Sequence, residues 1–264
     1  MKKVLFYRRG GLGDTLLTFP IFEVLKRKNC YIIAIGNTDY LKIAKEIGWV
    51  DEIYSDLYPE ILKKDYDLKI FFSKSEGFPP FPSERIWIVD YYFNLLNLEK
   101  NFSLILPIKD FSKSPLKNKV VLHPGSGSFK KIPDFSLFEK IEKYLISQGF
   151  KTIYLIGEAD SWIKDFTNNY WECLDSLLIA KALKSAKCFI GLDSGISHLV
   201  SYLGIKSFLF YGPTDPVVWK PIGKNYKIIS LNLDCSPCFP KVCKNKKCLD
   251  VKLLFNKFLE IFNN

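Results

Sequence analysis

Short apolar runs alternate with amphipathic segments along the chain, and this alternation predicts a repeated strand–helix fold. The apolar run at residues 3–8 predicts a buried strand, and residues 14–28 predict an amphipathic helix. The pattern continues with strands expected at 30–36, 52–54 and 68–72 and a helix at 40–47. Strands that alternate with helices in this way are typical of α/β domains with parallel sheets.

A second series of the same kind begins after a stretch of mixed charge. Residues 101–117 contain Pro107 and Pro115 and predict a linker. Beyond it, strands are expected at 119–125, 152–157, 188–192 and 207–212, and helices at 136–148, 176–185, 194–203 and 250–262. Two such series predict two doubly wound domains, residues 1–115 and 116–264. Ligands of such sheets bind beyond the carboxyl ends of the strands, so we expect a central cleft there.

The composition fits a folded protein that works on anionic partners. Of the 264 residues, 48% are hydrophobic, which is enough for two cores. The first apolar run is too short for a signal peptide, and no stretch of eighteen apolar residues occurs, so we expect a cytoplasmic protein. The net charge of +10 favours phosphorylated substrates or an acidic membrane face. No nucleic-acid-binding motif accompanies this charge, and nucleic acid is not an expected partner.

The segment after the strand at 188–192 predicts an anion site. Asp193, Ser194 and Gly195 form a small-residue turn at the start of a helix. Free backbone N–H groups and the helix dipole favour anions at such a turn. His198 follows Ser194 by about one helical turn and can face the same ligand. The alternative is an ordinary helix cap with a packed histidine.

The loop after the first strand combines basic, small and acidic residues. Gly11 and Gly13 permit a close approach of the backbone to a ligand, and Arg8 precedes them. The glycines do not complete G-x-G-x-x-G, and no acidic residue ends the second strand, so a dinucleotide-dependent oxidoreductase is disfavoured. Asp14 is either a helix N-cap or a general base that faces the cleft.

Two further loops supply polar groups at predicted strand ends. The loop at 123–133 offers backbone donors, the hydroxyl of Ser126 and the ammonium of Lys130, a combination that suits an oxyanion. It lacks the spacing of a P-loop, which disfavours ATP hydrolysis, and a flexible surface loop is the alternative. Glu158 ends another strand, where a carboxylate can accept hydrogen bonds from ribose hydroxyls or simply occupy an exposed turn.

Four of the seven cysteines form one cluster near the end of the chain. Their spacing is Cys235-x2-Cys238-x4-Cys243-x4-Cys248. The first pair has the spacing of a zinc site, but a second C-x2-C pair is absent. A structural metal, disulfides and free thiols therefore all remain open, and a catalytic role is not expected.

These motifs together resemble glycosyltransferase family 9, which contains the ADP-heptose:lipopolysaccharide heptosyltransferases. The resemblance rests on segments in both halves of the chain: GLGDTLLTFP (11–20), HPGSG with K-x-I-P (123–133), GLDSGISHLVSYLG (191–204), FYGPTDP (210–216) and CSPCFPKVCKNKKCL (235–249).

The resemblance implies a GT-B architecture of two Rossmann-like domains that face a central cleft, with acceptor bound by the first and nucleotide-sugar by the second. It implies an inverting, cofactor-free and metal-independent transfer, with heptose from ADP-heptose to a lipopolysaccharide core as the expected reaction. The acceptor would be a phosphorylated glycolipid at the inner membrane face. A non-catalytic sugar-nucleotide-binding module of envelope glycan assembly is the alternative.

The resemblance also assigns roles to single residues. Asp14 matches the catalytic base, and Lys130 matches the lysine that contacts the donor diphosphate. Glu158 matches an acid that contacts the ribose. The donor phosphate motif corresponds to Asp193, Ser194, Gly195 and His198.

Overall fold

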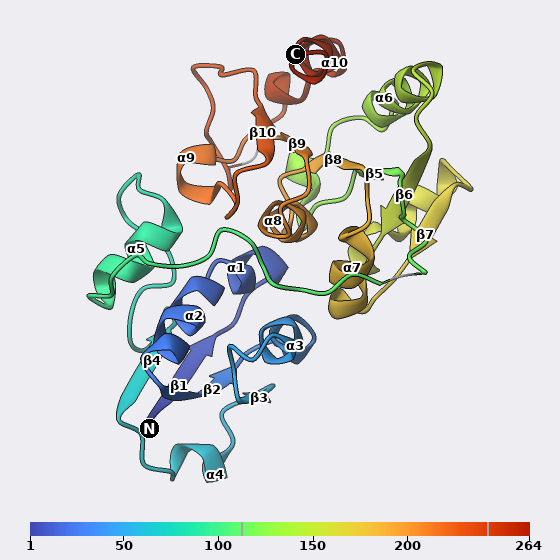
Figure 1. The fold of residues 1–264 in the computed structure, drawn as a ribbon. Helices are drawn as coiled ribbons and strands as arrows, with labels where there is room; N and C mark the ends of the chain where they lie inside the picture. Colours follow the sequence, from blue (N-terminus) through green and yellow to red (C-terminus); the bar gives the residue numbers. More distant parts are fainter. Residues whose placement is uncertain (112, 242) are drawn as a thin grey trace.

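Two parallel β-sheets, one in each half of the chain, organise the fold (Figure 1). This computed structural model describes residues 1–111, 113–241 and 243–264, and for Glu158 it describes the backbone alone. We call the part from β1 to α5 the first lobe and the part from β5 to α10 the second lobe. The boundary that we propose between residues 115 and 116 lies in the segment that joins α5 to β5.

The first lobe has a four-stranded sheet in the order β3-β2-β1-β4, and each neighbouring pair is parallel. The strands are β1 (Lys2–Arg8), β2 (Cys30–Ile35), β3 (Glu52–Tyr54) and β4 (Leu68–Phe72). The helices are α1 (Leu12–Leu16), α2 (Phe19–Arg27), α3 (Thr38–Glu46), α4 (Pro59–Leu62) and α5 (Ile88–Leu95).

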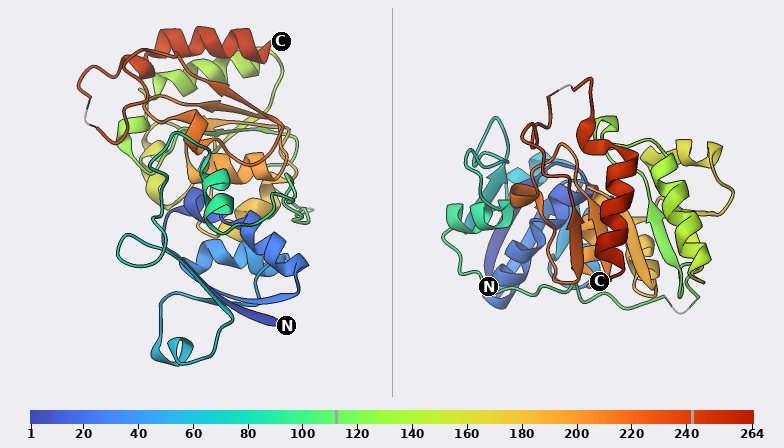
Figure 2. Two further views of the ribbon diagram at one scale, coloured as in Figure 1. Left: turned by 90° about the vertical axis from the view of Figure 1, so that its left-hand side faces the viewer. Right: turned by 90° about the horizontal axis from the view of Figure 1, so that it is seen from above.

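The second lobe has a six-stranded parallel sheet in the order β10-β9-β8-β5-β6-β7. Its strands are β5 (Val120–His123), β6 (Thr152–Ile156), β7 (Tyr170–Glu172), β8 (Cys188–Leu192), β9 (Ser207–Phe210) and β10 (Tyr226–Ile229). Its helices are α6 (Ser136–Ser147), α7 (Ser176–Leu183), α8 (Gly195–Tyr202), α9 (Pro216–Trp219) and α10 (Val251–Phe262), with 3-10 turns η1 (Phe129–Lys131), η2 (Glu158–Asp165) and η3 (Lys247–Leu249). Helices α6 and α10 pack side by side (Figure 2).

The predicted α/β class with two parallel sheets is confirmed, but several details of the prediction differ from the structure. Helices α4, α5 and α9 were not expected. The helix expected at 14–28 is two helices, because Pro20 has no N–H to donate to the carbonyl of Leu16. The Thr18 hydroxyl instead donates to the Thr15 carbonyl at 2.7 Å where α1 ends. Strands β7 and β10 were not expected, because both lie at sheet edges, are partly exposed and show no buried apolar run.

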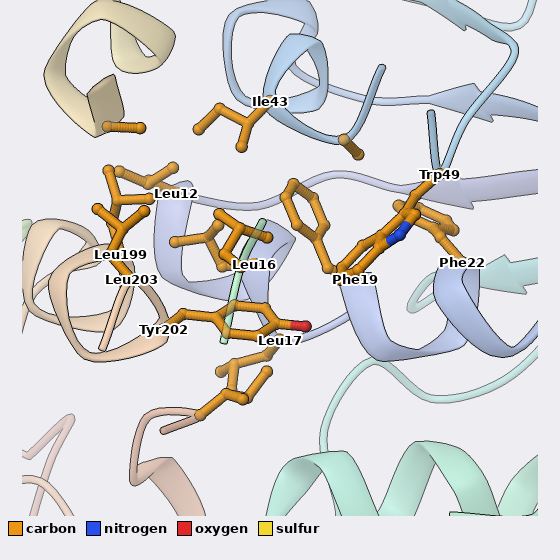
Figure 3. Packing of buried hydrophobic residues seen from close by; sticks show 14 of the residues in the cluster. Leu12, Leu16, Leu17, Phe19, Phe22, Ile43, Trp49, Leu199, Tyr202 and Leu203 are labelled. Carbon is orange, nitrogen blue, oxygen red and sulfur yellow. The ribbon is translucent and has the colours of Figure 1, made fainter. Parts of the chain in front are cut away.

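A shared hydrophobic cluster joins the lobes where α1 meets α8. Leu12 and Leu16 of α1 belong to the same buried cluster as Leu199 and Tyr202 of α8 (Figure 3). Full burial of a leucine side chain contributes about 1.5–3 kcal/mol, so this contact holds the two lobes in a defined relation. A second contact between the lobes joins α3 and α7, where Lys181 Nζ lies 2.5 Å from Glu46 Oε1. Within the described residues, the structure has no helix that could cross a membrane.

Candidate active site

A cavity of about 840 Å³ lies between the two lobes at the carboxyl ends of the strands. Segments that follow β1, β2 and β4 line it from the first lobe, and segments that follow β5, β6, β7, β8, β9 and β10 line it from the second. This is the place that parallel-sheet topology assigns to ligands. Most of the residues singled out from the sequence line it, namely Gly11, Gly13, Asp14, Ser126, Asp193, Ser194, Gly195 and His198.

The Asp14 carboxylate is held at the first-lobe wall by two hydrogen bonds. Its Oδ2 accepts from the Gly11 backbone N–H at 3.0 Å, and its Oδ1 accepts from Arg8 Nη2 at 3.2 Å. Gly11 is the N-cap of α1, so Asp14 is the third helical residue and not the cap itself. Arg8 is 6% exposed and lies behind Asp14, whereas the Asp14 side chain is 26% exposed. The carboxylate is therefore fixed in direction and still open to a ligand.

Two glycines allow the N-terminal ends of α1 and α8 to touch. A Cβ on Gly13 would lie 2.9 Å from Cδ2 of His198, and a Cβ on Gly195 would lie 2.7 Å from Cβ of Leu12. Both distances are shorter than carbon atoms can approach without displacement, so a side chain here would displace His198 or Leu12. This crossing brings Asp14 and His198, which are far apart in the sequence, to one cavity.

The N-terminus of α8 forms the middle of the second-lobe wall. Ser194 caps the helix, with its Oγ 3.3 Å from the Ser197 backbone nitrogen. The Ser126 hydroxyl donates to the Asp193 carbonyl at 2.8 Å, which ties the loop after β5 to this helix end. Burial lowers the pKa of His198 despite the nearby carboxylates, so its imidazole is neutral at pH 7.

The neighbouring lysines of η1 point to different places. Lys131 Nζ lies 2.7 Å from Asp193 Oδ2 and lines the cavity. Lys130 is exposed, and its Nζ donates to the Pro240 carbonyl at 2.8 Å. Sequence reasoning selected Lys130 and not Lys131, because a tight turn aims adjacent side chains differently and the sequence does not say which one lines the cavity.

Sequence reasoning also missed a buried pair beneath the loop after β5. His123 Nε2 lies 3.0 Å from Asp160 Oδ2, and His123 Nδ1 lies 3.5 Å from Ser194 Oγ. Burial raises the pKa of the Asp160 carboxyl, but the hydrogen bond and charge of His123 outweigh it, and the net pKa is lowered. A Cβ on Gly125 would lie 1.9 Å from Asp160 Oδ1. The signal available in the sequence was a histidine at a predicted strand end, followed by Pro124 and Gly125.

The remaining sequence candidates lie elsewhere or outside the description. The side chain of Glu158 lies outside the described residues, so its position is not assigned. Cys235 and Cys243 are exposed, whereas Cys238 and Cys248 are more buried, and all seven cysteines are free. Among the described residues, no group of three or more histidine, cysteine or carboxylate side chains is arranged to hold a metal ion.

Comparison with known proteins identifies the family. The model of "Glycosyltransferase family 9 (heptosyltransferase)" matches residues 93–249. The chain is 28% identical to lipooligosaccharide heptosyltransferase 2 of Campylobacter jejuni subsp. jejuni serotype O:6, with 94% of each protein covered. It is 34% identical to lipopolysaccharide heptosyltransferase 1 of Salmonella typhimurium over 24% of this chain and 22% of that protein.

Solved structures show the same fold at low sequence identity. The ADP-heptose lps heptosyltransferase II of E. coli superposes with a TM-score of 0.73 at 13% identity, covering 100% of this chain and 99% of that one. A family 9 glycosyl transferase of Veillonella parvula gives a TM-score of 0.70 at 16% identity, covering 86% and 85%. The GT-B architecture expected from the sequence is thereby confirmed. The family match spans more than half of the chain, and this protein is a glycosyltransferase that belongs to family 9, the heptosyltransferase family.

Proposed function

We propose that this enzyme transfers heptose from ADP-heptose to the core of a lipooligosaccharide or lipopolysaccharide, with inversion at the anomeric carbon. Heptosyltransferases are the named relatives that match the chain along nearly its full length. The observation that carries the proposal is the position of Asp14. Its carboxylate lies on the first-lobe wall of a cavity whose second-lobe wall includes the N-terminus of α8.

The cavity is long enough to hold the parts of a nucleotide-sugar in order along the second sheet. It follows the strand ends from β9 across β8, β5 and β6 to β7. Four steps between neighbouring strands span about 19 Å. We place the nucleoside at the β6 and β7 end, beside Leu174 and Ile179, and the diphosphate at the N-terminus of α8. The transferred sugar then lies toward β9 and α1, within reach of Asp14.

The proposed reaction is one displacement. An acceptor hydroxyl gives its proton to Asp14 as its oxygen bonds to the anomeric carbon, while the bond from that carbon to the diphosphate oxygen breaks. Because attack and departure occur on opposite sides of the carbon, a single displacement inverts the configuration. The backbone N–H groups at Ser194 and Gly195 and the ammonium of Lys131 receive the negative charge that develops on the diphosphate. Lys130 joins them if its side chain leaves the Pro240 carbonyl.

We also propose that the protein binds anionic membrane surfaces, because its acceptor would be a lipid-linked glycan. The net charge is +10, and residues 241–247 contain four lysines and no carboxylate. Each basic side chain near an anionic surface contributes about 1 kcal/mol, and salt screens this attraction. The fraction of the protein that sediments with phosphatidylglycerol vesicles should therefore fall sharply in half-molar salt. Binding that salt does not change would contradict the electrostatic attachment.

The transfer is tested with purified protein, ADP-heptose and O-deacylated lipooligosaccharide that lacks core heptose. The proposal predicts a product one heptose heavier with inverted anomeric configuration, and weaker or no transfer from UDP-, GDP- and dTDP-sugars. A donor that binds only the folded state raises the melting temperature, so the same nucleotides are compared by thermal unfolding. Transfer of another sugar, or stabilisation by another nucleotide in preference to ADP, would contradict the donor assignment.

A further inference from the structure

Two aromatic side chains, one from each lobe, meet in the cleft and take no part in the chemistry described above. The rings of Phe81 and Trp219 lie 5.6 Å apart between centroids at an angle of 64°. Both line the cavity, and Phe81 is 42% exposed although it is a large apolar side chain. Such exposure of an aromatic pair inside a ligand cavity is typical of a surface that a ligand covers.

Phe81 is connected to the candidate base through Arg8. The guanidinium carbon of Arg8 lies 5.2 Å from the centroid of the Phe81 ring, and the same guanidinium donates to Asp14 at 3.2 Å. Arg8 is almost fully buried, so its position is fixed by packing as well as by charge. The Phe81 ring is therefore fixed in position, with the Arg8 side chain between it and the Asp14 carboxylate.

The segment that carries Phe81 is anchored to the opposite lobe. Arg85 Nε lies 2.5 Å from Oδ2 of Asp215, the N-cap residue of α9, and Trp87 Nε1 donates to the Lys220 carbonyl at 2.8 Å. Trp219 is the last residue of α9, and its carbonyl accepts from the buried Tyr211 hydroxyl at 2.9 Å. Both rings are thus held by contacts on either side of them, which limits the entropy lost when a ligand binds.

We propose that Phe81 and Trp219 form a platform for the acceptor sugar ring, a role that rests on the proposed function. The C–H groups on one face of a pyranose ring carry a small positive charge, and an aromatic face is negative, so the two stack. A ring on this platform presents a hydroxyl to Asp14. With the donor diphosphate at α8, the transferred sugar lies between the diphosphate and the acceptor ring on this platform.

Thr214 supplies a polar group to the same end of the cavity. It follows β9, lines the cavity, and its Oγ1 has no hydrogen-bond partner among the described residues. A buried hydroxyl without a partner costs free energy, and rotation about its Cα–Cβ bond turns it toward a ligand. A second hydroxyl of the acceptor ring would satisfy it. Aromatic area with a few polar groups is the usual composition of a site that binds a small molecule.

The test compares Phe81→Leu, Trp219→Leu and Phe81→Tyr with Phe166→Leu as the matched control. Phe166 is also exposed and also stands edge-on to a tryptophan, Trp162 at 5.9 Å, but it does not line the cavity. Each leucine variant of the platform should raise the KM for O-deacylated lipooligosaccharide about tenfold, with the KM for ADP-heptose within about twofold. Phe81→Tyr keeps the ring and should restore the wild-type KM, and Phe166→Leu should not differ from wild type.

Binding without turnover separates this proposal from the proposed function. Saturation-transfer NMR with O-deacylated lipooligosaccharide and no donor should show ring protons of the probe close to aromatic protons of the protein, and Trp219→Leu should remove the effect. This result holds even if ADP-heptose proves not to be the donor. Unchanged acceptor KM and unchanged saturation transfer in both leucine variants would overturn the platform. A rise in donor KM equal to that of the acceptor would overturn its assignment to the acceptor sugar.

Discussion

The two walls of the cleft differ in how much of their polar chemistry is already paired within the protein. On the second-lobe wall, Lys131 is bonded to Asp193, His123 is bonded to Asp160, and Ser126 is bonded to a backbone carbonyl. His123 and Ser126 are buried and Lys131 is partly buried, so each of these side chains already has a partner within the protein. The first-lobe wall carries two carboxylates: Asp39 is paired with Lys42, whereas Asp14 is held in direction beside Arg8 and is partly exposed.

This difference indicates a division of labour. Rearranging a network of paired polar groups costs free energy. The second lobe therefore suits a ligand whose shape stays the same in every reaction cycle, such as the nucleoside diphosphate. An exposed, directed carboxylate suits proton transfer to a group that arrives from outside. Substitutions on the two walls should therefore affect different measured quantities.

The largest effect should follow Asp14→Asn, which keeps the shape of the side chain and removes its basicity. Positioned base catalysis contributes roughly 10²–10⁴-fold, so turnover should fall by about that factor. ADP affinity measured by calorimetry should stay within about twofold, because the proposed diphosphate site lies on the other wall. Wild-type turnover in the Asp14→Asn enzyme would show that Asp14 is not the general base.

The adjacent lysines of η1 should differ in how much they contribute to stability. Lys131→Met leaves the buried Asp193 carboxylate without its cation and should lower the unfolding free energy by about 3 kcal/mol. Lys130→Met removes an exposed side chain and should leave the melting temperature unchanged, while the ADP dissociation constant rises about tenfold. If Lys130→Met binds ADP as tightly as the wild type, Lys130 has no part in the donor site.

Asp160→Asn should destabilise the second-lobe wall in a pH-dependent way. The lost hydrogen bond to His123 should cost about 1.5–3 kcal/mol at neutral pH. Because the folded-state pKa of Asp160 is lowered, its contribution is present above about pH 4 and is lost as the pH falls through that lowered value. Urea unfolding at a series of pH values should show the two proteins converging in acid. A constant difference across this range would contradict the ionised pair.

The smallest effect should come from an ion pair that joins the lobes away from the cavity. Glu46→Gln removes the partner of Lys181, and both side chains are about one-third or more exposed. Exposed pairs contribute less than about 1 kcal/mol, so the melting temperature should fall by less than about 4 °C. Turnover and ADP affinity should not change. A several-fold loss of turnover would mean that this contact, and not the crossing of α1 and α8, sets the relation of the lobes.

The parts of the site that sequence reasoning could predict are those encoded locally. A strand followed by small residues and a helix start is a local pattern, and it located Ser194, Gly195 and the loop that holds Asp14. The pairs His123–Asp160 and Phe81–Trp219 join residues far apart in the chain, and no local pattern encodes their contact. Lys131 lines the cavity and Lys130 points elsewhere because of the direction of a single turn, η1. The spacing of apolar residues in the sequence does not determine that direction.

The most direct test of the central claim is a crystal structure of the wild-type enzyme with ADP-2-deoxy-2-fluoro heptose, a donor analogue already seen bound to a structural relative from E. coli. We predict the diphosphate at the backbone N–H groups of Ser194 and Gly195, with the anomeric carbon between it and the Asp14 carboxylate. A diphosphate bound outside this crossing of α1 and α8, or Asp14 on the same side of the anomeric carbon as the departing oxygen, would contradict it.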